Sequence, residues 1–185
     1  MFIQDLIFDL KDGRRALLRN PVDADVPGYL AYLRQSAGET DFLGRYPEEC
    51  DRYTLEGETE RLARTNASEN EMVLFCIVDG AVVGFGRITF ETGMKTRHRA
   101  SVGVALLRAY WNMGIGTRMM RELIRIAEAR KDTLQIELEF IEGNERAKRL
   151  YEKMGFRITG VRPRAIRLKD GTLLNEYMMM REIER

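Results

Sequence analysis

Cysteine is scarce in this sequence, with Cys50 and Cys76 the two examples among 185 residues. Two cysteines are too few for the disulfide framework of a small secreted domain, and too few for a cysteine-ligated zinc cluster. Cys76 lies inside the apolar run MVLFCIV, which predicts a buried and chemically inert thiol. We therefore expect no disulfide scaffold and no metal centre.

The sequence also lacks an excess of positive or negative charge, and it lacks long apolar runs. The 30 basic and 29 acidic side chains give a net charge of +1, so the composition provides no field that would attract nucleic acid. No apolar run approaches the roughly 20 residues that span a bilayer. The first residues, MFIQDLIFDLKDG, carry acids where a secretory signal would carry bases. The sequence thus predicts a cytoplasmic protein without nucleic-acid or membrane partners.

What is present suits one globular domain. Apolar residues make up 44% of the chain and charged residues 32%, which is typical of a folded domain with a sizeable core. The sequence contains no repeat, no low-complexity tract and no clear linker. We therefore expect residues 1–185 to form a single domain.

The dipeptide Asp-Gly occurs three times, each time between two strand-like runs. Asp-Gly is a strong signal for a two-residue turn in a β-hairpin. The sequence therefore predicts three hairpins, which turn at Asp12-Gly13, Asp79-Gly80 and Asp170-Gly171. Their strands are expected over Phe2–Leu10 and Arg14–Arg19, over Met72–Val78 and Ala81–Phe90, and over Ile158–Leu168 and Thr172–Met180.

Apolar spacing predicts the remaining elements. They are helices over Ala24–Gln35 and Leu55–Asn66, a strand over Ala100–Leu107, a helix that ends near Arg130, a strand over Leu134–Phe140, and a helix that begins after Asn144 and stops at Gly155. The resulting order is β-β-α-α-β-β-β-α-β-α-β-β. We expect an α/β fold of the α+β kind, with a mixed, mostly antiparallel central sheet and helices on both faces.

Gly114 and Gly116 stand just before a helix-like run, in AYWNMGIGTRMM. Glycine weakens regular elements, so this pair suggests that the backbone needs freedom or closely approaches a ligand. Phosphate is the first candidate, because free N–H groups and the positive end of the helix dipole meet at a helix N-terminus. A P-loop is excluded, because no lysine follows either glycine. A dinucleotide-binding fingerprint stays open, with Met119 at its third glycine position and Glu137 as its acid.

Two longer segments make the pattern more specific. Residues 101–130 read SVGVALLRAYWNMGIGTRMMRELIRIAEAR, and residues 134–156 read LQIELEFIEGNERAKRLYEKMGF. They resemble, in order and spacing, the two central motifs of the GNAT superfamily of acyl-CoA-dependent N-acetyltransferases. The first is a strand, a glycine loop and a helix; the second is a strand, an asparagine and a helix with L-Y-E-K-x-G-F. The sequence departs from the family pattern at Trp111, where Arg or Gln is usual.

The resemblance implies a GNAT-like fold over nearly the whole chain and acetyl-CoA as co-substrate, without a metal. Main-chain N–H groups before and within the helix would hold the pyrophosphate. The pantetheine arm would follow the preceding strand, where Ser101, Gly103 and Ala105 leave room, although small residues beneath a packed helix explain them as well. The implied cofactor residues are Val104, Ala105, Leu106, Asn112, Met113, Gly114, Ile115, Gly116, Thr117, Asn144 and Tyr151.

Tyr151 is the candidate general acid. The departing CoA thiolate needs a proton, and a phenol can supply it. Tyr151 stands at the tyrosine of the family's L-Y motif, so the resemblance implies this role for it. A core position is the alternative, because Leu150 and Met154 flank it in the helix. Asn144 likewise either contacts the cofactor or caps its helix.

Glu139 is the candidate general base. An amine of ordinary pKa is mostly protonated at neutral pH, so it must lose a proton before it attacks the thioester. The resemblance implies Glu139, five residues before Asn144, and Glu137 shares its face of the strand. Both carboxylates would equally suit the exposed side of a strand. His98 and a water molecule are further candidates.

The acceptor is expected at the polar loop between the first two helices. Carboxylates there could receive a cationic amine, or a basic peptide, and aromatic rings add contact surface. A solvated acidic loop is the alternative interpretation. A small-molecule or peptide amine is the expected partner, and a homodimer is left open. The candidate acceptor residues are Glu39, Asp41, Phe42 and Tyr46.

Two classes of function therefore compete. The first is an enzyme that transfers an acetyl group from acetyl-CoA to a primary amine by direct attack in a ternary complex. The second is a module that binds acyl-CoA as a sensor, without turnover. Both need the glycine loop, but Tyr151 favours the enzyme, because binding alone needs no acid.

Overall fold

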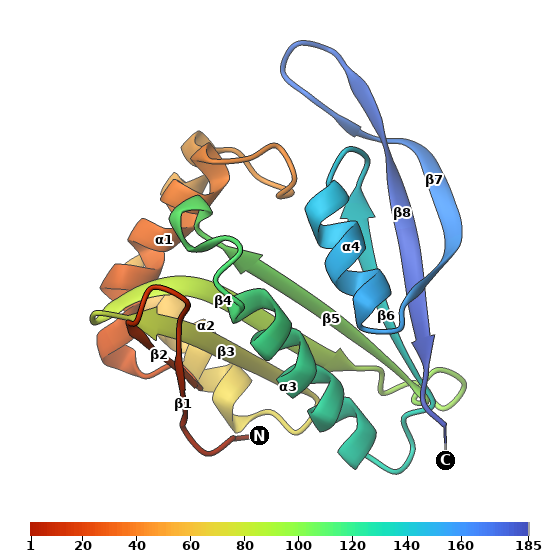
Figure 1. Cartoon of the computed structure of the whole chain (residues 1–185), viewed down its shortest axis with the longest axis horizontal. Helices are drawn as coiled ribbons and strands as arrows, with labels where there is room; N and C mark the ends of the chain where they lie inside the picture. Colours follow the sequence, from red (N-terminus) through yellow and green to blue (C-terminus); the bar gives the residue numbers. More distant parts are fainter. Residues whose placement is uncertain (185) are drawn as a thin grey trace.

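A central sheet dominates the computed structural model, which describes residues 1–184. Within these residues the sheet has eight strands in the order β1-β2-β3-β4-β5-β6-β8-β7 (Figure 1). Its neighbouring strands are antiparallel except β5 and β6, which are parallel. The strands are β1 (Leu6–Asp9), β2 (Arg15–Arg19), β3 (Glu71–Val78), β4 (Ala81–Phe90), β5 (Arg99–Leu106), β6 (Gln135–Ile141), β7 (Arg157–Arg167) and β8 (Leu173–Glu182).

Helices cover both faces of this sheet. In Figure 1, α3 crosses in front of the strands and α2 lies behind them. The alternation of side chains along β4 shows the same division: a Cβ added at Gly84 would lie 3.4 Å from the sulfur of Met119 in α3, whereas the Phe85 ring stacks on Tyr29 of α1. The helices are α1 (Val26–Gly38), α2 (Leu55–Ala67), α3 (Ile115–Ala129) and α4 (Glu145–Lys153), with short 3-10 turns η1 (Asp23–Asp25), η2 (Pro47–Arg52) and η3 (Arg108–Tyr110).

The predicted order of elements is confirmed, and so is the mixed, mostly antiparallel sheet with helices on both faces. Boundaries move by a few residues at the start of the chain. The first strand begins at Leu6 rather than Phe2, and α1 begins at Val26, because residues 23–25 form a 3-10 turn and Pro27 stands in the first turn of the helix. At the other end of the fold, Gly155 follows α4 with φ +85°, as a helix stop requires.

All three hairpins form, but the predicted two-residue turn is correct for one of them. Asp79 and Gly80 both have positive φ and directly join β3 to β4. At the first hairpin the prediction is wrong: Leu10 N–H donates to the Arg14 carbonyl, which leaves three residues in the loop. The third hairpin repeats this arrangement around Gly171. A three-residue hairpin loop places one residue in the left-handed region, which glycine adopts easily. In these two hairpins the glycine of Asp-Gly therefore indicated the turn, but the dipeptide did not indicate the loop length.

The parallel pair at the centre of the sheet is short. β5 and β6 pair over Arg99–Ser101 and Gln135–Glu137 and then separate, while β6 pairs along its whole length with β8. Beyond Ser101, β5 therefore has β4 as its partner on one side and, among residues 1–184, no strand on the other. The carboxyl halves of β5 and β6 flank a gap in the sheet. Ligands of sheets with parallel strands commonly bind at such openings.

The core lies between the sheet and its helices. Met119, Met120, Leu123 and Ala127, which share one face of α3, have no exposed surface. Cys76 is fully buried in β3, as predicted, and burial raises the pKa of its thiol from 9.0 to about 12. Among residues 1–184, no helix is long and apolar enough to cross a membrane.

Candidate active site

The turn that opens α3 has the geometry of an anion-binding loop. Gly114 is the N-cap of α3 and has φ +91°, a left-handed conformation that favours glycine. Asn112, two residues earlier, also has a positive φ of 63°. The N–H groups of the first helical turn have no acceptors within the helix, and neighbouring N–H groups in such a turn form a concavity that attracts anions.

Two side chains of this turn are engaged elsewhere in the protein. Ile115 is completely buried in the core, and the sulfur of Met113 lies 4.0 Å from a guanidinium nitrogen of Arg14. Their main-chain N–H groups are the parts that remain for a ligand. Asn112, Gly114, Gly116 and Thr117 instead line a cavity, described below.

Gly116 has a packing role as well. A Cβ at this position would lie 3.3 Å from a methyl group of Leu150 in α4 and 3.6 Å from one of Leu106 in β5. The missing side chain therefore lets the first turn of α3 approach both neighbouring elements. Helix, strand and turn meet at this point, which holds the loop in place against the gap.

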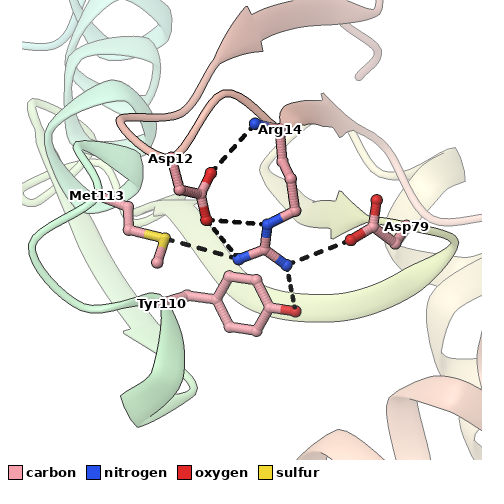
Figure 2. Close-up of polar contacts among 5 residues, drawn as sticks. All are labelled: Asp12, Arg14, Asp79, Tyr110 and Met113. Atoms are coloured by element: carbon pink, nitrogen blue, oxygen red, sulfur yellow. Dashed lines mark hydrogen bonds and ion pairs between the residues drawn. The ribbon is translucent and has the colours of Figure 1, made fainter.

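Arg14 contacts the segment that leads into the glycine loop (Figure 2). Its guanidinium donates to Asp12 at 2.7 and 2.9 Å and to Asp79 at 3.2 Å, and it lies over the ring of Tyr110 at 5.1 Å. Hydrogen bonds from Arg14 hold the pKa of the Asp12 carboxyl below its usual value. Together with the contact to Met113, this network joins the β1–β2 and β3–β4 turns to the segment that leads into the glycine loop.

The first cavity follows the gap between β5 and β6 on the side of α3 and α4. It has a volume of about 470 Å³, within the usual range of small-molecule sites. It brings together most of the residues predicted to bind the cofactor. These are Val104, Ala105, Leu106, Asn112, Gly114, Gly116, Thr117, Asn144 and Tyr151.

Cations at the mouth of this cavity were not predicted from the sequence. Arg146, Arg149 and Lys153 of α4 all line it. The guanidinium of Arg146 stacks on the ring of Trp111 at 3.1 Å, and the indole N–H of Trp111 donates to the Leu106 carbonyl at 2.9 Å. Burial lowers the pKa of Arg146 to about 10, so it still carries its charge at neutral pH. Trp111 thus holds a cation from α4 where the family pattern has Arg or Gln.

Tyr151 lines the first cavity. Its side chain is buried, with 5% of its surface exposed, and its ring packs against Phe140 of β6 and against Phe156. Burial raises the pKa of its phenol to about 12, against a smaller opposing effect of the nearby Arg146 charge. The residue therefore packs as a core aromatic and also lines the first cavity.

Asn144 both caps α4 and lies beside the cavity predicted for the cofactor. Its side-chain oxygen accepts a hydrogen bond from the Ala147 N–H at 3.2 Å and so caps α4. The residue lines the first cavity at the same time. With this oxygen engaged, its amide nitrogen is the group that remains for a ligand.

The candidate bases differ in position. Glu139 is exposed, lines the first cavity and lies 3.4 Å from Arg162 of β7. Burial of Glu137 acts to raise its pKa, but hydrogen bonds from Arg99, 2.6 Å away, and from Gln135, together with the Arg99 charge, lower it overall. His98 precedes β5 and lines neither cavity described here. Because Phe140 faces α4, the alternation of β6 directs Glu139 toward the α1 face of the sheet.

A second cavity of about 470 Å³ opens on that opposite face. It lies between β4, β5, α1 and α2, with aromatic walls formed by Tyr29, Tyr32, Tyr53 and Phe85. Gly103, Val104 and Ala105 line both cavities. The two cavities therefore lie against the same stretch of β5, one on the α3 face and one on the α1 face of the sheet. This arrangement allows two substrates to reach one point from opposite sides of the sheet.

The loop that follows α1 crosses this gap. Glu39 accepts a hydrogen bond from the Arg108 main chain at 2.5 Å, just beyond β5. Phe42 lies against Gly143, just beyond β6, where an added Cβ would be 3.6 Å from its ring. Figure 1 shows the loop reaching from α1 toward the turn between β6 and α4. The loop thus covers the wide end of the gap, and Phe42 lines the first cavity.

The other predicted acceptor residues lie outside both cavities. Tyr46 accepts a hydrogen bond from the Lys169 main chain at 3.0 Å, and the Lys169 side chain forms an ion pair with Glu48. Asp41 is exposed and lines neither cavity. The contacts of Tyr46 and Glu48 join the loop to the tip of the β7–β8 hairpin. Most carboxylates of this loop therefore have partners within the chain.

The described part of the chain, residues 1–184, contains no group of three or more His, Cys, Asp or Glu side chains that could hold a metal ion. The groups that the site presents are its turn, its cations, one buried phenol and one exposed carboxylate. These groups suit a phosphate-bearing donor and proton transfer.

The glycine turn that opens α3 and the two parallel strands that separate beside it together define a GNAT-like fold and site. The sequence profile described as the Acetyltransferase (GNAT) family matches residues 37–156, and the chain belongs to this family. The GNAT fold predicted from the motifs is therefore confirmed.

Three relatives illustrate this membership. An L-amino acid N-acetyltransferase, AaaT, of Escherichia coli K12 is 30% identical over 108 residues, which cover 58% of this chain and 66% of that protein, just under two thirds. A GNAT acetyltransferase from Streptococcus pneumoniae superposes with a TM-score of 0.84 at 27% identity, covering 91% of this chain and 99% of the other. A phosphinothricin acetyltransferase from Sinorhizobium meliloti, solved with acetyl-CoA, shares the fold with a TM-score of 0.76 at 19% identity, over 91% and 88% of the two chains.

Proposed function

We propose that this protein transfers the acetyl group of acetyl-CoA directly to the nitrogen of a primary amine while both substrates are bound. The observation that carries the proposal is the pair of cavities that meet at Gly103, Val104 and Ala105 from opposite faces of the sheet. A donor in one cavity and an acceptor in the other would have their reacting atoms side by side. Such positioning removes much of the entropic barrier to a reaction between two molecules.

The first cavity fits acetyl-CoA by the chemistry of its walls. N–H groups of the α3 turn and the cations of Arg146, Arg149 and Lys153 suit phosphate groups. Beyond Ser101 the main chain of β5 has no partner strand on the side of the gap, so its amides can accept an extended arm as a further strand would. When bound, acetyl-CoA supplies the acetyl group as a thioester.

Tyr151 is assigned the role of general acid. In the overall reaction a C–N bond forms, the C–S bond breaks, the amine loses a proton and the sulfur gains one. The phenol lies inside the first cavity and, with a pKa of about 12, carries its proton throughout the neutral range. It can therefore donate that proton to the departing sulfur.

Glu139 is assigned the role of proton acceptor for the amine, directly or through water. It lines the first cavity, and the alternation of β6 directs it toward the face of the sheet opposite to the one that carries Tyr151. The neighbouring Arg162, 3.4 Å away, forms an ion pair with this carboxylate. Acid and base would then act from the two faces of the sheet.

The class of acceptor is the least supported part of the prediction from sequence. A cationic amine was expected because the loop after α1 carries several acids, but Glu39 is bound by Arg108, and Glu48 is paired with Lys169. That expectation loses its support. The Escherichia coli relative acts on L-amino acids, and an amino acid is the first acceptor to test for this chain.

The deciding experiment measures CoA release and identifies the products over a panel of amines. The panel contains L-amino acids, simple alkylamines, a polyamine and a peptide with a free N-terminus. We expect acceptor-dependent CoA release, an N-acetylated product detected by mass spectrometry, and a higher melting temperature in the presence of acetyl-CoA.

Two results would count against the proposal. If millimolar acetyl-CoA left the melting temperature unchanged, the first cavity would not be a donor site. If acetyl-CoA stabilised the protein but no amine released CoA, the chain would be the acyl-CoA sensor that the sequence left open.

A further inference from the structure

The second cavity contains arginine side chains that lack an acidic partner. The Nε–H of Arg45 is buried and has no hydrogen-bond acceptor among the described residues, while one of its terminal nitrogens donates to the Ser36 hydroxyl at 3.0 Å. Arg87 of β4 lines the same cavity, and its side chain has no ion pair or hydrogen-bond partner within residues 1–184. A buried donor without an acceptor is costly, so such a donor commonly awaits a ligand.

The charges around this cavity do not balance. Its charged lining residues are Arg45, Glu58, Arg61 and Arg87. Glu58 is buried and forms an ion pair with Arg61 at 2.8 Å, and Arg61 also donates to the Tyr29 hydroxyl at 3.2 Å. The one acid is therefore already neutralised, and the positive charges of Arg45 and Arg87 are left without a counter-charge. An anionic group is the complement of such a site.

We propose that Arg45 and Arg87 bind a carboxylate of the amine acceptor, so that the natural acceptor is an amine that also carries an acidic group. This inference rests on the proposed acetyl transfer, and it names the substrate class of that site. Arginine is suited to the task, because its planar guanidinium presents paired donors that match the two oxygens of a carboxylate. The carboxylate would satisfy the Nε–H of Arg45 that the chain leaves unpaired.

The rest of the cavity indicates an apolar side chain on the acceptor. Leu33 and Leu43 join the aromatic walls formed by Tyr29, Tyr53 and Phe85. Tyr32 uses its hydroxyl to hold the Ala105 carbonyl at 2.9 Å, so its ring is fixed at the point where the two cavities meet. An amine with a carboxylate at one end and an apolar body would match both parts of the surface.

The test compares acceptors that differ in the carboxylate alone. L-phenylalanine, L-methionine and L-leucine are each assayed against their amides, with wild type, Arg45→Gln, Arg87→Gln and the control Arg64→Gln. Arg64 is an exposed arginine of α2 that lines neither cavity. The amine of an amino acid amide is less basic than that of the acid, so intrinsic reactivity at neutral pH favours the amide.

We expect wild type to prefer the acids in spite of this, by at least about tenfold in kcat/KM. Removing one charged donor should lower kcat/KM for the acids by about ten- to hundredfold. The same variants should change the value for the amides much less, and the KM for acetyl-CoA should stay the same. Arg64→Gln should change neither class of acceptor. Arg87→Gln is the safer variant for folding, because Arg87 is exposed and has no structural partner in the described chain.

Equal use of acids and amides by wild type would overturn the inference. An equal loss for acids and amides in Arg45→Gln and Arg87→Gln would overturn it too, since that result means that the arginines shape the loop rather than bind the acceptor. Calorimetry with CoA-saturated protein separates this inference from the proposed function. If no amine is acetylated, the proposed function fails. The carboxylate site would still be supported if wild type bound the acids tightly and the two variants did not. It would be rejected if wild type did not bind the acids.

Discussion

The hydroxyl of Tyr151 is one atom whose removal should separate catalysis from packing. The phenylalanine ring of Tyr151→Phe keeps the contacts with Phe140 and Phe156, so the melting temperature should change little. General acid catalysis is typically worth about 10²–10⁴-fold, so we expect kcat to fall by at least about tenfold, with acetyl-CoA binding nearly unchanged. Steady-state kinetics and calorimetry with acetyl-CoA measure the two effects.

The size of this fall should depend on the leaving group. A more acidic thiol leaves as a more stable thiolate and needs less protonation. An acetyl thioester of such a thiol should therefore reduce the difference in kcat between wild type and Tyr151→Phe. A variant that kept full kcat with acetyl-CoA would show that Tyr151 only packs in the core, and that the proton comes from solvent.

Gly114 and Gly80 form a matched pair at the residue scale. Both have strongly positive φ, +91° and +79°, and a Cβ at either would meet no atom of the described chain within 4 Å. Valine at either position should therefore cost a similar amount of stability, about 1–3 kcal/mol from backbone strain. Only Gly114→Val places its side chain where phosphate is expected, so it alone should weaken acetyl-CoA binding. Equal affinity in the two folded variants, measured by calorimetry, would place the pyrophosphate elsewhere.

At the scale of elements, α4 supplies the cations that the glycine turn lacks. Arg146 stacks on Trp111 and lines the first cavity, whereas Lys148 of the same helix does not line it. We expect Arg146→Gln to raise the Kd for acetyl-CoA by about tenfold, because it removes one charged partner of a phosphate. Lys148→Gln should have little effect.

Salt distinguishes this electrostatic role from a packing role. If Arg146 contacts phosphate, added salt should weaken the binding of acetyl-CoA to wild type more than its binding to Arg146→Gln. The same salt dependence in both proteins would mean that Arg146 only packs against Trp111.

Elements were more predictable from the sequence than the site was. Periodicity and Asp-Gly turns are local signals, and they predicted every strand and helix in order. Most residues predicted to bind the cofactor line the first cavity, because they belong to one continuous pair of motifs, but its cations Arg146, Arg149 and Lys153 were missed. Arg45 and Arg87 could not be found in this way, because their meeting depends on how α1, its loop and β4 pack together. The three-residue hairpin loops were not predicted, because the Asp-Gly dipeptide alone does not determine the register of the two strands.

At the scale of the whole molecule, the short pairing of β5 with β6 makes the proposed function possible. Had the parallel ladder continued beyond Ser101, it would have closed the sheet and separated the two cavities. The loop after α1 then bridges the open ends of both strands through Glu39 and Phe42. A gap of this kind exposes strand edges, and we infer that bound donor and acceptor protect them.

The rest of the sheet must therefore hold the fold together, and its tightly packed centre predicts a sensitivity to alkali. Burial raises the pKa of the Cys76 thiol from 9.0 to about 12, and those of Tyr29 and Tyr151 from 10.0 to about 12. A group whose pKa is higher in the folded state keeps its proton there while the unfolded chain loses it. Its contribution is complete below the unfolded pKa and is lost as the pH rises toward the folded value.

We therefore expect the free energy of unfolding to fall above pH 9, first because of Cys76 and above pH 10 also because of the tyrosines. Each such group contributes a slope of up to about 1.4 kcal/mol per pH unit. Urea unfolding of wild type and Cys76→Ala at pH 8, 9 and 10 tests this. The variant should lose stability at pH 8 through the cavity that it creates, yet show a flatter decline between pH 9 and 10. Parallel curves for the two proteins would mean that the Cys76 thiol ionises as readily in the folded protein as in the unfolded chain.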